Sequence, residues 1–71
     1  MTARCPGKKS WPELVGARGE DAVATIKREN SSIHFPIIVV EGTPVTFDYL
    51  CTRVWVWVNT SGFVVRVPKV G

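Results

Sequence analysis

The sequence lacks nearly every residue pattern that supports catalysis or metal binding. It contains one histidine, His34, and its six acidic residues have no spacing that favours general acid–base chemistry. It has no glycine-rich phosphate loop, and two cysteines with one histidine cannot complete a tetrahedral zinc site. We therefore expect no enzyme activity, no metal and no cofactor, and we place His34 at a surface or a strand end.

Long apolar runs and concentrated charge are also missing. No stretch approaches the roughly 20 apolar residues that span a bilayer, and the N-terminal residues show no signal-peptide core. The net charge of +3 comes from nine basic and six acidic residues that are spread along the chain. A nucleic-acid-binding domain usually gathers its basic residues in a patch. We expect neither a membrane nor a nucleic acid as a partner.

The chain length limits how much the protein can bury. Seventy-one residues bury only about 60% of the surface that the unfolded chain exposes, which leaves a thin core. The hydrophobic share of 45% argues against disorder. We expect one domain over residues 1–71, folded as a monomer, with too little interior for an enclosed active site.

The two cysteines, Cys5 and Cys51, lie far apart in the sequence. A disulfide between them would close a loop of about 46 residues and stabilise the fold by roughly 4 kcal/mol in the chain-entropy estimate. Two free buried thiols are the alternative. A disulfide would suit a secreted or vacuolar protein, although the sequence alone leaves the compartment unknown.

The first half of the chain predicts an arm, a turn and a helix. Residues 1–10 are polar and are expected to form an N-terminal arm. Ser10 and Glu13 have the spacing of a capping box, which predicts one short helical turn, and Trp11 is expected in the core. A helix is predicted over residues 20–29, because acidic residues open the segment, basic residues close it and apolar residues share one narrow face.

The second half predicts strands. The β-branched run within residues 33–40 indicates a strand that is buried on both faces or has a parallel partner, and Pro36 places it at an edge or a bulge. Residues 53–58 alternate strictly, with three valines on one face and Arg53, Trp55 and Trp57 on the other. Residues 63–67 are expected to complete a hairpin, with Trp57 packing toward the helix. The fold class is therefore α+β, with one helix packed on a small mixed sheet.

The segment between the two strands, residues 42–52, is the least regular part of the chain. It carries Phe47 and Tyr49 but no period that would bury both. Loops of this length are uncommon in small domains, and ordered ones are usually functional. An extended loop with an apolar side chain at its middle has the form of a peptide offered to another protein's cleft.

Several segments together resemble one family. They are Trp11-Pro-Glu-Leu-Val-Gly16, Gly42-Thr43, Val45-Thr-Phe-Asp-Tyr49, Arg53-Val54 and Val67-Pro-Lys-Val-Gly71. In this order they resemble the potato inhibitor I family of serine protease inhibitors, which includes eglin, and in particular its disulfide-bearing plant branch. The resemblance implies a helix-and-sheet scaffold that presents a long extended protease-binding loop, with a role in plant defence and the response to wounding.

The resemblance also implies which residues contact a protease. The reactive bond would lie between Phe47 and Asp48, with Phe47 in the primary specificity pocket of the protease. Phe47 implies chymotrypsin-like and subtilisin-like serine endopeptidases as partners, because relatives that target trypsin carry Lys or Arg there. The other loop residues that would contribute are Thr43, Pro44, Val45, Thr46, Tyr49 and Leu50.

Support for the loop is implied in the same way. Arg53 matches an arginine that hydrogen-bonds to the positions of Thr46 and Asp48, and a Cys5–Cys51 bridge matches the disulfide of the plant branch. The chain departs from part of the family at Trp55, which replaces a second supporting arginine and is expected to pack beneath the loop. It also departs at Leu50, where an arginine is common.

Two alternatives remain at this stage. The chain could be a non-inhibitory binding module that uses the tryptophan-rich hairpin face, with Trp57 as a contact. In the loop itself, Phe47 could turn into the core, and Asp48 could be a solvated turn residue.

Overall fold

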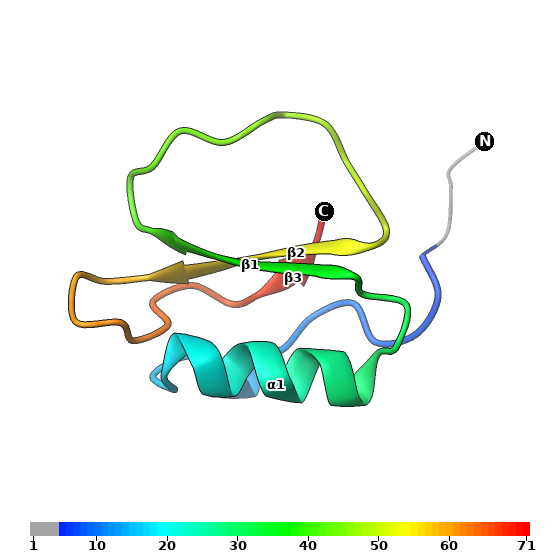
Figure 1. Ribbon diagram of the computed structural model, residues 1–71, viewed down its shortest axis with the longest axis horizontal. Coiled ribbons are helices and arrows are strands. Elements are labelled where there is room, and N and C mark those ends of the chain that lie inside the picture. Colours follow the sequence, from blue (N-terminus) through cyan, green and yellow to red (C-terminus); the bar gives the residue numbers. More distant parts are fainter. Residues whose placement is uncertain (1–4) are drawn as a thin grey trace.

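The computed structural model describes residues 5–71, so the first four residues of the predicted N-terminal arm lie outside the described part. The elements are a short 3₁₀ helix, η1 (Pro12–Leu14), the helix α1 (Gly19–Glu29), and the strands β1 (Phe35–Val40), β2 (Arg53–Val58) and β3 (Lys69–Val70). In Figure 1, α1 lies along one side of the sheet and residues 41–52 arch over the other side. The α+β fold predicted from the sequence, with one helix on a small mixed sheet, is confirmed.

The sheet explains why the loop is long. Its strand order is β1-β2-β3; β1 runs parallel to β2, and β3 runs antiparallel to it. Because β1 and β2 are parallel, the connecting segment must return along the whole strand, about 20 Å for six residues at roughly 3.3 Å each. Residues 41–52 are therefore drawn out across one face of the sheet instead of closing a tight turn.

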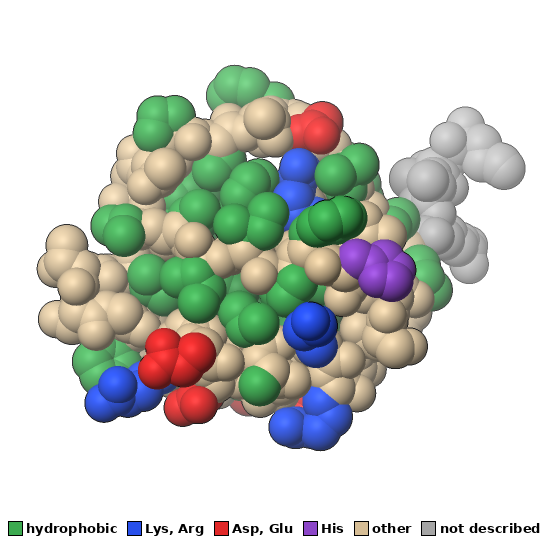
Figure 2. Space-filling model, viewed as in Figure 1, with side chains coloured by type: hydrophobic (Ala, Val, Ile, Leu, Met, Phe, Trp, Pro, Cys, Tyr) green, Lys and Arg blue, Asp and Glu red, His purple; other side chains and the backbone are tan. Residues whose placement is uncertain are grey.

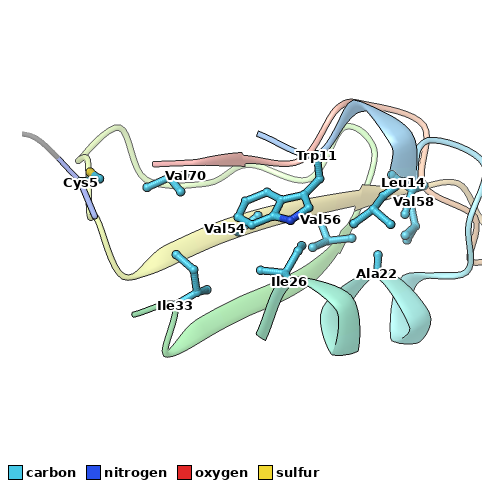
Figure 3. Close-up of a cluster of buried hydrophobic side chains, with 11 residues drawn as sticks. Cys5, Trp11, Leu14, Ala22, Ile26, Ile33, Val54, Val56, Val58 and Val70 are labelled. Atoms are coloured by element: carbon cyan, nitrogen blue, oxygen red, sulfur yellow. The ribbon is translucent and has the colours of Figure 1, made fainter. Parts of the chain in front are cut away.

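The core lies between α1 and the sheet (Figure 3). Val54, Val56 and Val58 all point toward α1 and are at most 3% exposed, as the strict alternation of β2 predicts. Ala22 and Ile26 on α1 are fully buried against them. The remaining buried hydrophobic residues are Cys5, Trp11, Leu14, Ile33, Val64 and Val70.

The expectation that the first strand is buried on both faces is wrong. β1 forms the edge of the sheet, and Phe35, Ile38 and Val40 are each more than 40% exposed. The β-branched run instead reflects the parallel pairing with β2, which was the other prediction for it. Pro36 lies at the edge as predicted, where its missing N–H breaks no bond to β2.

The predicted hairpin is only partly formed. The chain turns after β2, where the Asn59 amide donates to the Phe63 carbonyl, and Val58 and Val64 form a single antiparallel bridge. The strand predicted over residues 63–67 does not continue past Val65, whose amide donates to the Trp57 carbonyl. The pairing with β2 then shifts by two residues, so that Lys69 and not Val67 lies opposite Trp55. β3 follows only after Pro68, at residues 69–70.

Two smaller expectations also fail. Ser10 and Glu13 form no capping box: Ser10 bridges to Lys69 in the sheet, and Glu13 pairs with Lys8. Trp57 does not pack toward the helix, because its alternation with the buried valines places it on the opposite face. The short turn, the core position of Trp11 and the exposed position of His34 are confirmed.

Candidate functional site

Backbone hydrogen bonds fix the segment between β1 and β2 at both of its ends. At its start the Thr43 amide donates to the Val40 carbonyl at 3.0 Å, and Gly42, at φ +94°, supplies the left-handed conformation that this turn needs. At its end the Arg53 amide donates to the Leu50 carbonyl at 3.3 Å. Residues 43–50 between these turns have no regular structure.

Phe47 projects entirely into solvent. Its relative exposure is 103%, and its neighbour Tyr49 is 61% exposed. Figure 2 shows hydrophobic side chains on the outer rim of the arch formed by the loop. The alternative that Phe47 turns into the core is therefore wrong. An exposed aromatic side chain on an anchored loop is available to another protein.

One buried arginine holds the loop from below. Arg53 begins β2, is only 6% exposed and directs its guanidinium into the arch. Nη2 donates to the Asp48 carbonyl at 2.7 Å and to Asp48 Oδ1 at 3.3 Å, and Nη1 donates to Thr46 Oγ1 at 3.4 Å. The contacts that the family resemblance implies for Arg53 are thus present, and they reach the residues on both sides of Phe47.

The arginine is itself fixed by two further groups. Its Nε donates to the Gly71 carbonyl at 2.8 Å, and the Gly71 amide donates back to the Arg53 carbonyl at 2.9 Å. Its guanidinium carbon lies 4.7 Å from the ring centroid of Trp55, within the range of a cation–π contact. Trp55, half-buried on the loop side of the sheet, therefore supports the loop through Arg53.

The charge of Asp48 is stabilised where it stands. A hydrogen bond from the Thr46 hydroxyl, and then the Arg53 guanidinium, hold the pKa of the Asp48 carboxyl below its usual range. The Asp48 side chain is still 55% exposed, so solvent screens this ion pair in part. The carboxylate is therefore neither buried nor free: it is partnered at the surface of the loop.

A disulfide anchors the far end of the loop. Cys5 and Cys51 are bonded, which confirms the bridge and excludes the alternative of two free thiols. The Tyr49 hydroxyl lies 3.5 Å from Cys5 Sγ, which can only accept a hydrogen bond because a disulfide sulfur carries no proton. The bridge thus joins the segment before η1 to the loop just after Leu50.

The tryptophan-rich face forms a second concave surface. A shallow cleft of about 540 Å³ is lined by Trp55, Trp57, Arg66, Lys69 and Gly71, together with Val67 and Val70. Arg66 stacks on Trp57, with 4.9 Å between guanidinium carbon and ring centroid, and also pairs with Glu41 at 3.0 Å. One face of each indole ring in the cleft is therefore already covered by an arginine.

Sequence reasoning missed the role of the last residue. In the sequence Gly71 is only the end of a motif, yet it bonds to Arg53 through both its amide and its carbonyl. Gly71 also lies close to Tyr49: a Cβ atom added at Gly71 would stand 3.4 Å from the nearest atom of the Tyr49 ring. No residue pattern signals such a contact, since it depends on β3 lying beside the start of β2.

Within residues 5–71 no group of three or more histidine, cysteine or acidic side chains could hold a metal ion. In the same range no helix has the length and apolar character needed to cross a membrane. The site is thus made of one loop, one arginine that supports it, one disulfide and one terminal glycine. This arrangement defines a protein that presents an anchored, extended loop on a helix-and-sheet scaffold.

Comparison with known proteins gives the particular family. The sequence model described as potato inhibitor I family matches residues 3–71. The chain is 52% identical to an inhibitor of trypsin and hageman factor from Cucurbita maxima (94% of this chain, 97% of the relative). It is 50% identical to a trypsin/subtilisin inhibitor from Amaranthus caudatus (93% of this chain, 94% of the relative).

A solved structure of the bitter gourd trypsin inhibitor has the same fold, with a TM-score of 0.92 and 46% identity over 97% of this chain and all of that one. The chain therefore belongs to the potato inhibitor I family. The members similar to it are proteinase inhibitors and not enzymes.

Proposed function

We propose that this protein inhibits chymotrypsin-like and subtilisin-like serine proteases by substrate-like, slowly reversible binding, with Phe47–Asp48 as the reactive bond. The observation that carries the proposal is the position of Phe47: its side chain is fully exposed, while the residues on both sides of it are anchored to Arg53. A role in plant defence and the response to wounding would follow from this activity.

Binding needs an extended, ordered segment. A protease takes its substrate as an added strand in the active-site cleft, and residues 43–50 form no internal secondary structure that must first be undone. The loop is already held by Arg53, by the Cys5–Cys51 bridge and by the turn at Gly42. Little conformational entropy is then lost on binding, which favours affinity.

The same contacts explain why cleavage would be slow to complete. Attack of the protease serine on the Phe47 carbonyl would break the Phe47–Asp48 bond, leave the serine acylated by the Phe47 carbonyl group and free the amino group of Asp48. Arg53 bonds to Thr46 on one side of that bond and to the Asp48 carbonyl on the other. The new amine is therefore held close to the acyl group, where its high effective concentration favours re-formation of the peptide bond.

Phe47 determines which proteases are expected to bind. An aromatic side chain fits a deep or broad apolar pocket, whereas a pocket built around a buried carboxylate gains no partner for its charge. The Cucurbita maxima and Amaranthus caudatus relatives, both named as trypsin inhibitors, are about half identical to this chain, so its scaffold is compatible with either specificity. The side chain at this position would decide between them.

The proposal is tested by inhibition titrations against chymotrypsin, subtilisin and trypsin in parallel. We expect nanomolar inhibition of the first two and little inhibition of trypsin. Strong inhibition of trypsin alone would move the reactive bond away from Phe47, and no inhibition of any of the three would refute the proposal.

A substitution at the same position tests the specificity separately. Phe47→Lys should transfer inhibition to trypsin, because the lysine can pair with the carboxylate of a cation-specific pocket while the supporting contacts below the loop stay in place. Titration of this variant against the three proteases gives the result directly. If the Phe47→Lys variant still ignores trypsin, the pocket assignment is contradicted.

The tryptophan-lined cleft supports a second candidate function, a non-inhibitory binding module. The observation that favours it is the cleft itself, in which Trp55 and Trp57 form an aromatic wall. In that case Trp57→Ala would abolish binding to a partner protein or a carbohydrate, and Phe47→Ala would leave it unchanged. The inhibitor proposal expects the reverse for protease binding.

A further inference from the structure

The outer edge of β1 is open and carries no charge. Among the strands that the structure describes, β1 has a neighbour on one side only. Its six residues, FPIIVV, include no charged side chain, and Phe35, Ile37, Ile38 and Val40 are between 36% and 55% exposed. Figure 2 shows hydrophobic side chains gathered across the middle of this view. Edge strands of this kind are usually protected by charge, by bulges or by another chain.

The register with β2 determines which backbone groups point outward. The amides of Phe35 and Glu41 donate to β2-side carbonyls, of Thr52 at 2.9 Å and of Val58 at 2.8 Å. Backbone groups alternate along a strand, so residues 35, 37, 39 and 41 turn theirs to β2. The backbone groups of residues 36, 38 and 40 therefore point away from the sheet.

Two of these outward-pointing positions lack a backbone group that could bond to another strand. Pro36 has no N–H to donate. The Val40 carbonyl already accepts the Thr43 amide at 3.0 Å, in the turn that starts the loop. The groups that remain available are the amides of Ile38 and Val40 and the carbonyls of Pro36 and Ile38, which makes two donors and two acceptors.

From this pattern we propose that the outer edge of β1 is a self-association surface, at which β1 of a second copy pairs antiparallel with Ile38 opposite Ile38. Opposed residues in an antiparallel pair exchange N–H···O=C bonds. The two Ile38 residues would exchange two such bonds, and each Val40 amide would donate to the Pro36 carbonyl of the other copy. The missing donor of Pro36 then faces the occupied carbonyl of Val40.

Other registers satisfy the edge less well. A shift of two residues in one direction places an Ile38 carbonyl opposite Pro36, which has no N–H to offer. The opposite shift places an Ile38 amide opposite the Val40 carbonyl, which already accepts from Thr43. The centred register is the one in which each available donor finds a free acceptor, and, like any antiparallel pairing of two identical strands, it is compatible with a two-fold dimer.

The dimer would be one continuous six-stranded sheet. Directly opposed residues share a face, so the two-fold axis stands perpendicular to the sheet. Both copies of α1 would then cover one face, and both loops would lie over the other, as the arrangement in Figure 1 implies. A single strand edge is a small contact, so we expect association at high concentration and a monomer at the concentrations of inhibition assays.

The association is tested on the whole chain by sedimentation velocity and by NMR amide shifts, from micromolar protein to about 1 mM. We expect the mass to rise toward that of a dimer. The amides of Ile38 and Val40 should shift with concentration, while those of Ile37 and Val39, which are already bonded to β2, should shift much less. A monomer at every concentration would overturn the proposal, and so would a dimer whose shifts map to the tryptophan-lined cleft.

A matched pair of variants separates the backbone bond from the side chain. Ile38→Pro removes an amide that β2 does not use, and it should weaken the dimer about tenfold or more relative to Ile38→Ala, which loses similar side-chain contacts but keeps the N–H. Val40→Lys adds a charge to the edge without altering residue 38, and should also abolish the dimer. If all three variants associate as well as the parent chain, β1 is not the interface.

Discussion

The two faces of β2 are held by different interactions. Toward α1 the strand shows three valines that are at most 3% exposed, and burial of apolar surface stabilises this side. Toward the loop the same strand shows Arg53 and Trp55, and charge-assisted hydrogen bonds and a cation–π contact stabilise that side. The comparison teaches that folding and the shape of the loop depend on separate sets of residues within one strand.

The largest effect should come from the helix-facing side. Ile26→Ala would remove a fully buried side chain from α1, and we expect it to destabilise the fold by about 2–5 kcal/mol. The folded fraction should inhibit its protease as well as the parent chain does, because no loop contact involves Ile26. Denaturant unfolding and an inhibition titration corrected for folded protein measure the two quantities. A large loss of affinity in the folded fraction would show that the two faces are not independent.

Phe47→Ala should have the opposite effect: it should weaken protease binding and leave the stability of the fold unchanged. The side chain is fully exposed in the free protein, so we expect almost no change in the free energy of unfolding. As an aromatic residue that fills a pocket of the partner, it should contribute about 2–4 kcal/mol to binding chymotrypsin. A loss of less than tenfold in affinity would contradict its assignment as the specificity residue.

Arg53→Lys sharpens the comparison, because it keeps the charge but removes the planar fork that reaches Thr46 and Asp48 together. Hydrogen bonds of a charged group contribute about 1.5–3 kcal/mol, and we expect a loss of this size in affinity together with faster cleavage of the loop. Arg66→Lys is the matched control, because its partner Glu41 lies outside residues 43–50. Equal effects of the two substitutions on the cleavage rate would argue against a special role for Arg53.

The smallest effect should be that of pH on the loop. The pKa of Asp48 in the folded protein is held below its ordinary value of 3.8. The ionised Asp48 side chain therefore stabilises the folded loop above pH 3.8, and this stabilisation is lost as the pH falls through the lowered pKa. Thr46→Val should raise the pKa of the Asp48 carboxyl toward its ordinary value, which an NMR titration of that carboxyl reports. An unchanged pKa in this variant would remove the Thr46 hydroxyl as a cause.

Much of the fold could be predicted from the sequence, because local patterns carried it. Charge placement and a narrow apolar face located α1, and the alternation of residues 53–58 identified the buried valines. The loop was visible as a long segment without a period. The burial of β1 was not predictable, since a β-branched run signals parallel pairing and burial alike, and only the strand order shows that β1 is an edge.

The residues of the candidate site could be predicted from the sequence, but the contacts between them could not. Phe47, Asp48 and Arg53 followed from the resemblance, whereas the contacts of Arg53 with Gly71 and of Tyr49 with Cys5 depend on how distant segments meet. The strand predicted at residues 63–67 failed for a related reason. Val64 lies opposite Val58 but Lys69 lies opposite Trp55, so the pairing with β2 shifts by two residues, and no local pattern reveals such a shift.

The central claim is that a protease treats Phe47–Asp48 as its scissile bond and that the scaffold keeps the two ends together. The most direct test is mass spectrometry of the protein after long incubation with a small amount of chymotrypsin. We predict a species heavier by one water molecule that separates, only after reduction, into fragments 1–47 and 48–71, because the Cys5–Cys51 bridge joins them. A cut at any other bond, or rapid degradation to small peptides, would contradict the account.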